Sequence, residues 1–270
     1  MNVLGSELTT TMPWIDRPEA DIAARLAASG RSYGFDMAAK LADWRRDGFV
    51  IFEQVVDHAT IDAYLEEMRH LREHHNRYVV SLEVRGTQTW TPAVPAATLE
   101  GAGVKFNHLH TSSLHAAKLS LTREVTEFLA AVFEAPVTPM QSLTFWMGSQ
   151  QPTHIDYPYV CVQRRLGYMA ASWIPLEDVH EDAGPLAYFP GAHRPEVSGF
   201  FDWGHGDILS RNETRVRNGM DFAHFLDAQM QAQGIPPKVF LPRKGDVLIW
   251  HANMPHAGLP VRDPKRTRKS

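Results

Sequence analysis

The chain has a single cysteine, Cys161, among its 270 residues. An intrachain disulfide is therefore excluded, which fits a reducing compartment. The sequence also lacks any apolar run near the roughly 18 residues that a membrane span requires. Its first residues show neither the basic start nor the apolar core of a signal peptide. We therefore expect a soluble, cytoplasmic protein that does not associate with a membrane.

Positive and negative charges are nearly balanced. Lysine and arginine number 27 and aspartate and glutamate 31, so the formal net charge is −4. Nucleic-acid-binding domains usually carry a strongly basic surface, and nucleic acid is not an expected partner. The sequence also has no internal repeat and no low-complexity linker. Its length and its 44% of hydrophobic residues suit one large domain, which we expect to span residues 1–270.

Apolar spacing divides this domain into two halves. Helical periodicity predicts helices over 18–29, 37–46, 57–75 and 122–135, and a strand over 48–56 follows an Asp-Gly turn. After Pro136, short β-rich runs separated by turn signals occupy 139–148, 157–163, 167–179, 184–193 and 238–252. We therefore expect an α+β fold that is mainly helical over 1–135. Residues 136–270 would form a jelly roll, or double-stranded β-helix, core.

One long insertion interrupts the β-rich half. Residues 198–234 contain a helical pattern from about 219 and could form a lid over a pocket. A peripheral packing element, or a contact within a homodimer, is the alternative.

The stretch THIDY places His154 and Asp156 two positions apart. On a strand, side chains at i and i+2 point to the same face, and Ile155 between them would point to the opposite layer. An imidazole and a carboxylate on one face would supply two ligands of a metal site. An isolated H-x-D pair is more often a surface pair, so the interpretation needs a third ligand.

Two histidines that follow the run DVLIW could supply the third ligand, namely His251 and His256. Two histidines and one carboxylate suit non-haem Fe(II), because they leave coordination positions open for substrate and dioxygen. Farther along, Arg268 and Ser270 are again two positions apart, and a guanidinium with a hydroxyl can receive a carboxylate. An enzyme that uses Fe(II) and a keto acid requires both features. The alternative for this basic tail is a solvated chain end.

These motifs resemble the phytanoyl-CoA dioxygenase family of Fe(II)/2-oxoglutarate oxygenases. The similarity lies in THID at 153–156, in SWIPLEDVHEDAGPLAYFPGAHR at 172–194, and in KGDVLIWHANMPHAGLPVRDPKRTRKS at 244–270, in that order. It covers about residues 37–270 and is weakest at 75–135 and 195–235.

The resemblance implies a role for each candidate residue. His154, Asp156 and His256 would bind iron, and His251 would pack beside Trp250. Arg268 would bind the far carboxylate of 2-oxoglutarate, with Ser270 as a weaker partner. The remaining candidates for the cosubstrate pocket are Trp173, Gln141, Thr144 and Lys105. The alternative role of Lys105 is that of a solvated loop residue. His193 is expected to be structural.

The implied reaction hydroxylates an unactivated C–H of a small molecule with dioxygen and releases succinate and CO2. Relatives that halogenate have a small residue in place of Asp156, so this carboxylate favours hydroxylation, with desaturation or ring closure left open. Tyr157, Tyr159, Arg164 and Arg165 could receive an anionic or amino-acid-like substrate.

Two other functions fit the same residues. The protein could be a cupin-like metal enzyme that does not use 2-oxoglutarate, or a non-catalytic binding protein on an oxygenase scaffold. The family normally continues beyond the arginine with a strand that closes the core. We therefore expect the natural chain to continue past Ser270, since Arg268 would otherwise lie in a frayed end.

Overall fold

The structure, a computed structural model, describes residues 12–160, 167–194, 197 and 219–270. Its α-helices are α2 (Ile22–Ser29), α3 (Met37–Asp47), α4 (His58–Glu73), α5 (Leu114–Ser120), α6 (Arg123–Phe133), α7 (Tyr157–Val160) and α9 (Gly219–Ala232). Its 3-10 helices are η1 (Trp14–Asp16), η2 (His75–Arg77), η3 (Thr91–Ala93), η4 (Ala96–Glu100) and η5 (Leu109–Thr111). None of the described helices is long and apolar enough to cross a membrane.

The strands form three antiparallel sheets. Their bounds are β1 (Phe49–Phe52), β2 (Ser81–Val84), β3 (Thr87–Trp90), β4 (Val104–Asn107), β5 (Leu143–Phe145), β6 (Ala170–Trp173), β7 (Leu186–Tyr188), β8 (Lys238–Phe240), β9 (Val247–His251) and β10 (His256–Gly258). The sheet orders are β1-β9-β6, β10-β7-β8 and β3-β2-β4-β5. An isolated antiparallel bridge joins His154 to His256 beside β10. The fold is therefore mixed, with helices packed around antiparallel sheets.

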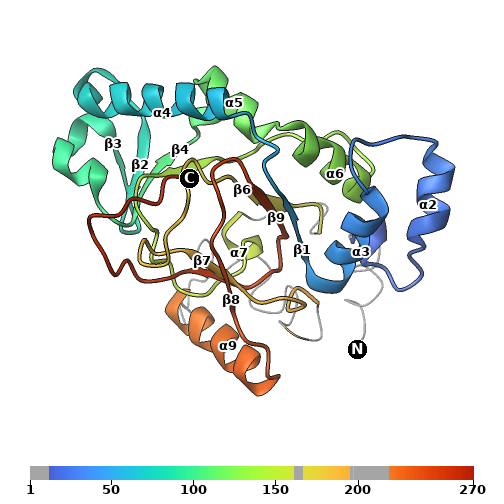
Figure 1. Cartoon of the computed structure of the whole chain (residues 1–270). Helices are drawn as coiled ribbons and strands as arrows, with labels where there is room; N and C mark the ends of the chain where they lie inside the picture. Colours follow the sequence, from blue (N-terminus) through green and yellow to red (C-terminus); the bar gives the residue numbers. More distant parts are fainter. Residues whose placement is uncertain (1–11, 161–166, 195–196, 198–218) are drawn as a thin grey trace.

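The last residues of the chain lie inside this arrangement. The Phe145 N–H donates to the Ser270 carbonyl at 2.9 Å, and the Ser270 N–H donates back to Phe145 at 3.2 Å. The Leu176 N–H donates to the Lys269 carbonyl at 2.9 Å. The C-terminus thus lies between β5 and the segment after β6, well within the molecule (Figure 1).

Helices cover the sheets on several sides (Figure 1). α4 and α5 run over the sheet of β2–β4, whereas α2, α3 and α6 gather at the end of the molecule where β1 lies. α9 lies on the other side, below β7 and β8 in this view. The largest apolar cluster joins α3, α4 and α6 to β1 and β9, with Leu41, Trp44, Ile61 and Phe128 fully buried.

The helix ends have the expected capping chemistry. Asp21, Asp36 and Asp57 each precede a helix and accept hydrogen bonds from backbone N–H groups of its first turn. Gly30 and Gly48 end α2 and α3 in the left-handed conformation that glycine favours. The four helices expected before residue 136 are confirmed as α2, α3, α4 and α6.

Two parts of the expectation were wrong. Residues 157–163 do not begin a strand, because 157–160 form the short helix α7. Proline is tolerated in a first helical turn, and the Asp156 carbonyl accepts from the N–H groups of Tyr159 and Val160. The strands β2, β3 and β4 were also missed. Arg85 and Gly86 both have positive φ, as a tight hairpin turn requires, and the Arg-Gly pair was the available signal.

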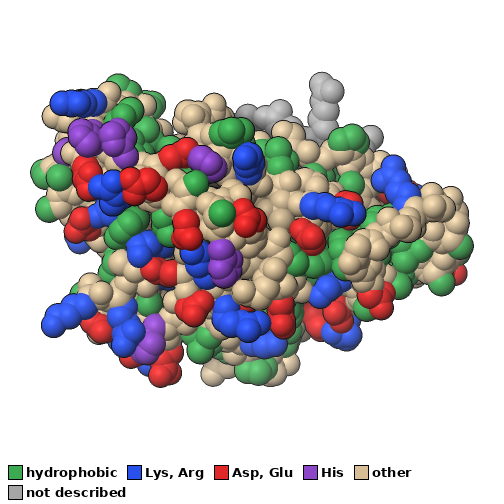
Figure 2. All heavy atoms as spheres, turned by 45° about the horizontal axis from the view of Figure 1, so that its top comes forward, with side chains coloured by type: hydrophobic (Ala, Val, Ile, Leu, Met, Phe, Trp, Pro, Cys, Tyr) green, Lys and Arg blue, Asp and Glu red, His purple; other side chains and the backbone are tan. Residues whose placement is uncertain are grey.

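Charge is mixed on the surface seen in Figure 2. Basic and acidic side chains alternate across this face, and several histidines gather near one end. The face therefore has no continuous basic stripe of the kind that tracks a nucleic-acid backbone.

Gly48 provides a test of the packing between α3 and the β-core. Its φ is +79°, and a Cβ there would lie 2.4 Å from the His193 ring and 2.6 Å from Met254. We expect Gly48→Ala to lower the free energy of unfolding by about 2–5 kcal/mol, since backbone strain and overpacking add. Chemical denaturation measures this.

Gly30→Ala is the matched control. Gly30 also has a positive φ, +58°, but nothing lies within 4 Å of its added Cβ. Only backbone strain remains, so we expect a loss of about 1 kcal/mol. Equal losses in the two variants would contradict the packing described here.

Candidate functional site

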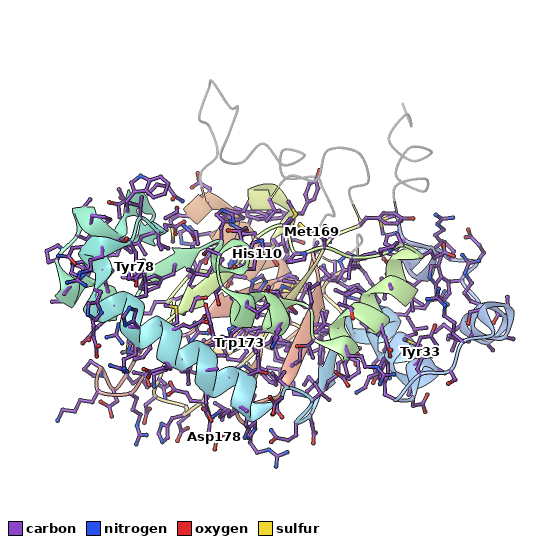
Figure 3. All side chains as sticks on the ribbon, turned by 90° about the horizontal axis from the view of Figure 1, so that it is seen from above. Tyr33, Tyr78, His110, Met169, Trp173 and Asp178 are labelled. Carbon is purple, nitrogen blue, oxygen red and sulfur yellow. The ribbon has the colours of Figure 1, made fainter. Side chains whose placement is uncertain are left out.

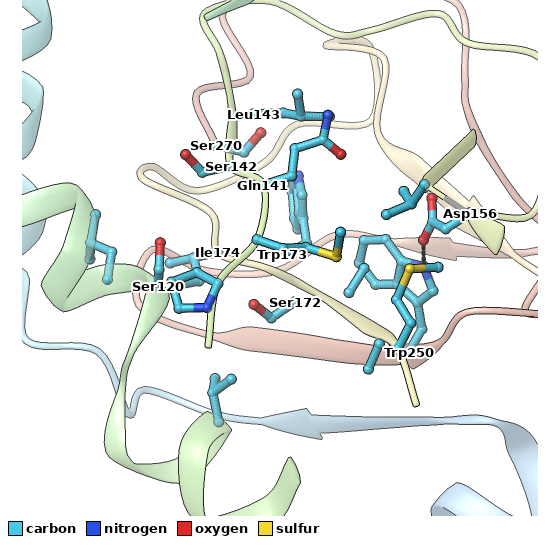
Figure 4. Close-up of a pocket in the computed structure, with 18 of the residues that line it drawn as sticks. Ser120, Gln141, Ser142, Leu143, Asp156, Ser172, Trp173, Ile174, Trp250 and Ser270 are labelled. Atoms are coloured by element: carbon cyan, nitrogen blue, oxygen red, sulfur yellow. Dashed lines mark hydrogen bonds between the residues drawn. The ribbon is translucent and has the colours of Figure 1, made fainter. Parts of the chain in front are cut away.

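A cavity of about 960 Å³ opens between β5, β6 and the His154–His256 bridge. It brings together eight of the predicted site residues, which are His154, Asp156, His256, Arg268, Ser270, Trp173, Gln141 and Thr144. Figure 4 shows Asp156 and Trp250 at one end of this cavity, Trp173 in the middle and Ser120 toward the helices. Trp173 also lies near the middle of the whole molecule, whereas Tyr33, Tyr78 and Asp178 lie toward its edges (Figure 3).

Three side chains at one end of the cavity converge. The His256 Nε2 lies 3.6 Å from Asp156 Oδ1, and the His154 Nε2 lies 4.0 Å from the same oxygen. The three potential ligand atoms all lie within 4.8 Å of one another. Among the described residues this is the one group of three that could hold a metal ion.

The backbone orients both imidazole rings. The Nδ1 of His154 lies 2.8 Å from the Pro152 carbonyl, and the Nδ1 of His256 lies 3.0 Å from the Met254 carbonyl. A carbonyl can only accept, so Nδ1 carries the proton and Nε2 keeps its lone pair for a metal. Burial is the main cause that holds the pKa of His154 well below its usual value, and the neighbouring His256 is the second cause. His154 is therefore neutral, as a metal ligand must be.

Asp156 is fixed by a residue that the sequence interpretation did not include. The Trp250 indole N–H donates to Asp156 Oδ2 at 2.8 Å (Figure 4). This leaves Oδ1 facing the two imidazoles. Trp250 comes from β9, and the sequence alone offered only its position one residue before His251.

The expected strand through THIDY is only partly present. His154 pairs with His256, but Asp156 is held by a hydrogen bond from its N–H to the Ala252 carbonyl at 3.0 Å and is followed directly by α7. Ile155 does face the opposite side, as expected, where it packs against Phe222 and Leu226 of α9. This helix belongs to the predicted insertion 198–234, of which residues 198–218 lie outside the described residues.

His251 lies away from the cavity. Its Nε2 is 3.4 Å from Asp16 Oδ2, and its ring lies between those of Trp44 and His193, at centroid distances of 5.7 and 5.4 Å. The convergent histidine is therefore His256. His193 is buried in the same place. Burial is the main cause that keeps its pKa well below the usual value, and the neighbouring His251 is the second cause.

Arg268 is buried, so the alternative of a solvated chain end is wrong. The residue is 2% exposed, and its backbone N–H donates to the Trp146 carbonyl at 3.1 Å. The guanidinium carbon lies 5.2 Å from the Trp173 ring centre and 5.4 Å from that of Phe145. Pairing of the tail with β5 therefore carries this cation into the cavity.

The buried guanidinium lacks an anion. Its Nε has no hydrogen-bond partner, and no carboxylate among the described residues lies within ion-pair distance. The Ser270 hydroxyl, which lines the same cavity, is buried and also lacks a partner within the described part of the chain. Burial lowers the pKa of Arg268 to about 10, so the group is still charged at neutral pH.

The other predicted residues have three different outcomes. Thr144 lines the cavity and shares a 2.6 Å hydrogen bond with the Tyr64 hydroxyl, which the sequence interpretation had also missed. Lys105 does not line the cavity, and it is not a solvated loop residue. It lies on β4 and pairs with Glu83 of β2 at 2.6 Å. Arg164 and Arg165 lie outside the described residues.

Three solved structures illustrate the fold that this chain shares with known proteins. The carbocyclase SnoK from nogalamycin biosynthesis, alpha ketoglutarate dependent, is 18% identical with a TM-score of 0.58, covering 90% of this chain and 83% of its own. EctD from S. alaskensis, with 2-oxoglutarate and 5-hydroxyectoine, is 16% identical with a TM-score of 0.58, covering 89% and 77%. The epimerase SnoN, with Fe3+, alpha ketoglutarate and nogalamycin RO, is 17% identical with a TM-score of 0.54, covering 86% and 80%.

At 16–18% identity, these likenesses show a shared fold only. The family follows from the sequence. The model of the phytanoyl-CoA dioxygenase (PhyH) family matches residues 44–270, and the chain belongs to that family. No curated protein sequence matches the chain at a significant level.

Trp250→Phe tests the support of Asp156. The substitution keeps an aromatic ring in β9 but removes the N–H that holds Oδ2. We expect divalent-metal affinity to fall by about 10–100-fold, as is usual when a group that orients a metal ligand is lost. Titration with Co(II) measures the affinity.

Trp44→Phe is the control. Trp44 is equally buried in the core, and its indole nitrogen has no hydrogen-bond partner among the described residues. The Trp44→Phe variant should bind divalent metal with unchanged affinity. An effect of the same size in both variants would mean that general loosening, rather than the Asp156 contact, weakens binding.

Proposed function

We propose that the protein is an Fe(II)- and 2-oxoglutarate-dependent dioxygenase that hydroxylates an unactivated C–H of a small molecule. The observation that carries the proposal is the buried Arg268, which has no anionic partner among the described residues and lines the same cavity as the His154, Asp156 and His256 cluster. A buried cation is costly unless it is paired, so the cavity is built for an anion.

The ligand cluster fits Fe(II). Two neutral imidazole nitrogens and one carboxylate oxygen are the donors of the facial triad, which leaves coordination positions open. Neither Nε2 atom has a hydrogen bond to a described residue, and both face Asp156 Oδ1. A site closed by four protein ligands would instead be structural.

The other end of the cavity fits the far carboxylate of 2-oxoglutarate. A carboxylate could accept from the guanidinium of Arg268 and from the hydroxyl of Ser270. The Arg268 Nε and the Ser270 Oγ have no hydrogen-bond partner among the described residues. The rings of Trp173 and Phe145 flank the guanidinium and keep water from it. The relatives EctD and SnoN were solved with 2-oxoglutarate or alpha ketoglutarate bound, which supports this assignment.

Each residue has a defined task in this reaction. His154 and His256 bind the metal as neutral ligands, while Asp156 offsets part of its charge. Trp250 keeps Asp156 in one orientation, and Arg268 anchors the cosubstrate. Fe(II) bound there would supply dioxygen activation coupled to the conversion of 2-oxoglutarate to succinate and CO2.

A second proposal concerns the fold and the domain organisation. We propose that β1-β9-β6 and β10-β7-β8 are the two layers of a jelly roll, and that residues 1–270 form one domain. Support comes from the antiparallel pairing within each sheet and from the family match over 44–270.

Succinate release tests the function. With Fe(II), 2-oxoglutarate and dioxygen, the protein should form succinate, and adding a substrate from a pool of small molecules should accelerate it. Absence of succinate under all conditions, with metal bound at the triad, would favour a metal enzyme that does not use 2-oxoglutarate.

Arg268→Met tests the cosubstrate anchor. We expect 2-oxoglutarate affinity to fall by about 10–100-fold, since a charge-assisted hydrogen bond is worth roughly 1.5–3 kcal/mol. Without 2-oxoglutarate, the variant should unfold at a temperature about 2 °C or more above wild type, because an unpaired buried charge is removed. Thermal unfolding with and without 2-oxoglutarate measures both effects.

Lys269→Met is the control, because Lys269 pairs with Glu177 at 2.6 Å and does not line the cavity. It should respond to 2-oxoglutarate as wild type does. An Arg268→Met variant that 2-oxoglutarate still stabilises fully would contradict the assignment.

Asp156→Ala tests the metal ligands. It removes the only carboxylate among the three ligands, so we expect iron content to fall well below one per chain and succinate release to stop. Elemental analysis measures the first effect. Asp246→Ala, which removes a buried carboxylate bonded to Gln54, is the control and should retain iron. Full iron content in Asp156→Ala would contradict the assignment of Asp156 as an iron ligand.

A further inference from the structure

The two ligand residues of the H-x-D pair are separated by Ile155, whose side chain points away from the cavity. It is 2% exposed and belongs to one apolar cluster with Phe222 and Leu226 of α9, which are 1% and 0% exposed. Phe225 covers the edge of this cluster. The helix therefore packs directly against the residue between the two ligands.

The ligand segment has little secondary structure of its own to hold it. His154 takes part in an isolated bridge rather than a strand, and Asp156 has one backbone hydrogen bond from its N–H, to Ala252. On the cavity side, Trp250 restrains the Asp156 carboxylate. On the opposite side, the contact to α9 adds a further restraint on the backbone, because a shift of Ile155 moves both neighbours with it.

α9 reaches the site at a second point. A Cβ at Gly219, the first residue of the helix, would lie 3.3 Å from the Tyr159 hydroxyl. The Tyr159 ring stands edge-on to the His154 ring, with a centroid distance of 5.6 Å and an interplanar angle of 81°. The helix thus supports His154 from behind, through Ile155, and from the side, through Tyr159.

We propose that α9 is a positioning element of the metal site, in which Phe222 and Leu226 hold Ile155 and thereby set the separation and direction of His154 and Asp156. The inference rests on the proposed function, since it takes the triad as a metal site. It differs from a lid, because these contacts lie behind the ligands and not over the cavity. Metal ligands need placement to within about 0.5 Å, which explains why the packing matters.

The stripe that α9 buries supplies a matched pair of variants. Phe222, Leu226 and Met230 follow one another at intervals of four, and Met230 is as buried as Phe222, at 1% exposed. Met230 packs in a different cluster, with Phe189 and Ala192. Truncation at Met230 therefore loosens the same helix without touching Ile155.

Titration with Co(II), whose visible absorption reports coordination geometry, tests the proposal. Phe222→Ala is expected to weaken Co(II) binding about tenfold and to alter the absorption, as loss of ligand support does elsewhere. Met230→Ala should match wild type in both, even where its thermal stability falls as far. Phe222→Leu should restore most of the affinity. Phe222→Ala and Met230→Ala with the same affinity and spectrum would overturn the proposal.

A smaller change keeps the test open should Phe222→Ala fail to fold. Ile155→Val removes one methyl group from the contact, and its Co(II) spectrum should differ from that of wild type. An affinity and a spectrum identical to those of wild type would overturn the positioning role. Wild-type protein that binds no Co(II) would instead refute the metal site itself, and with it the proposed function.

Discussion

The backbone pair between His154 and His256 brings together two segments about a hundred residues apart. Two hydrogen bonds, of 3.0 and 2.9 Å, join the pair. Residues directly opposite each other in an antiparallel pair place their side chains on the same face. The two imidazoles therefore meet, with ring centres 4.2 Å apart, and Asp156 follows two residues later. The metal cluster depends on this single point of register.

The second constraint is electrostatic. Arg268 enters the interior because the tail pairs with β5, and no described carboxylate accompanies it. The unpaired charge costs free energy in the protein alone, which an anionic ligand would recover on binding. A carboxylate ligand that pairs with Arg268 would remove this cost, and the free energy recovered would add to the affinity for that ligand. The His154, Asp156 and His256 cluster lies at the other end of the cavity.

The sequence predicted the features that are local. Periodicity identified α4, and the i, i+2 spacing identified His154 and Asp156 as a pair. Contacts between distant segments could not be predicted in this way. The Trp250–Asp156 hydrogen bond joins residues 94 apart, and the burial of Arg268 depends on its pairing with the strand region at Trp146. The four residues of α7 are too few to show any period, so a strand was predicted in their place.

The central claim is that the triad and Arg268 form one site, in which a keto acid touches both the metal and the guanidinium. Anaerobic calorimetry of 2-oxoglutarate, with and without Fe(II), tests this most directly. Binding energies through one shared ligand are linked, so affinity should rise about tenfold or more when Fe(II) is present, with a new visible absorption band. Equal affinity in the two conditions, with no band, would contradict the account.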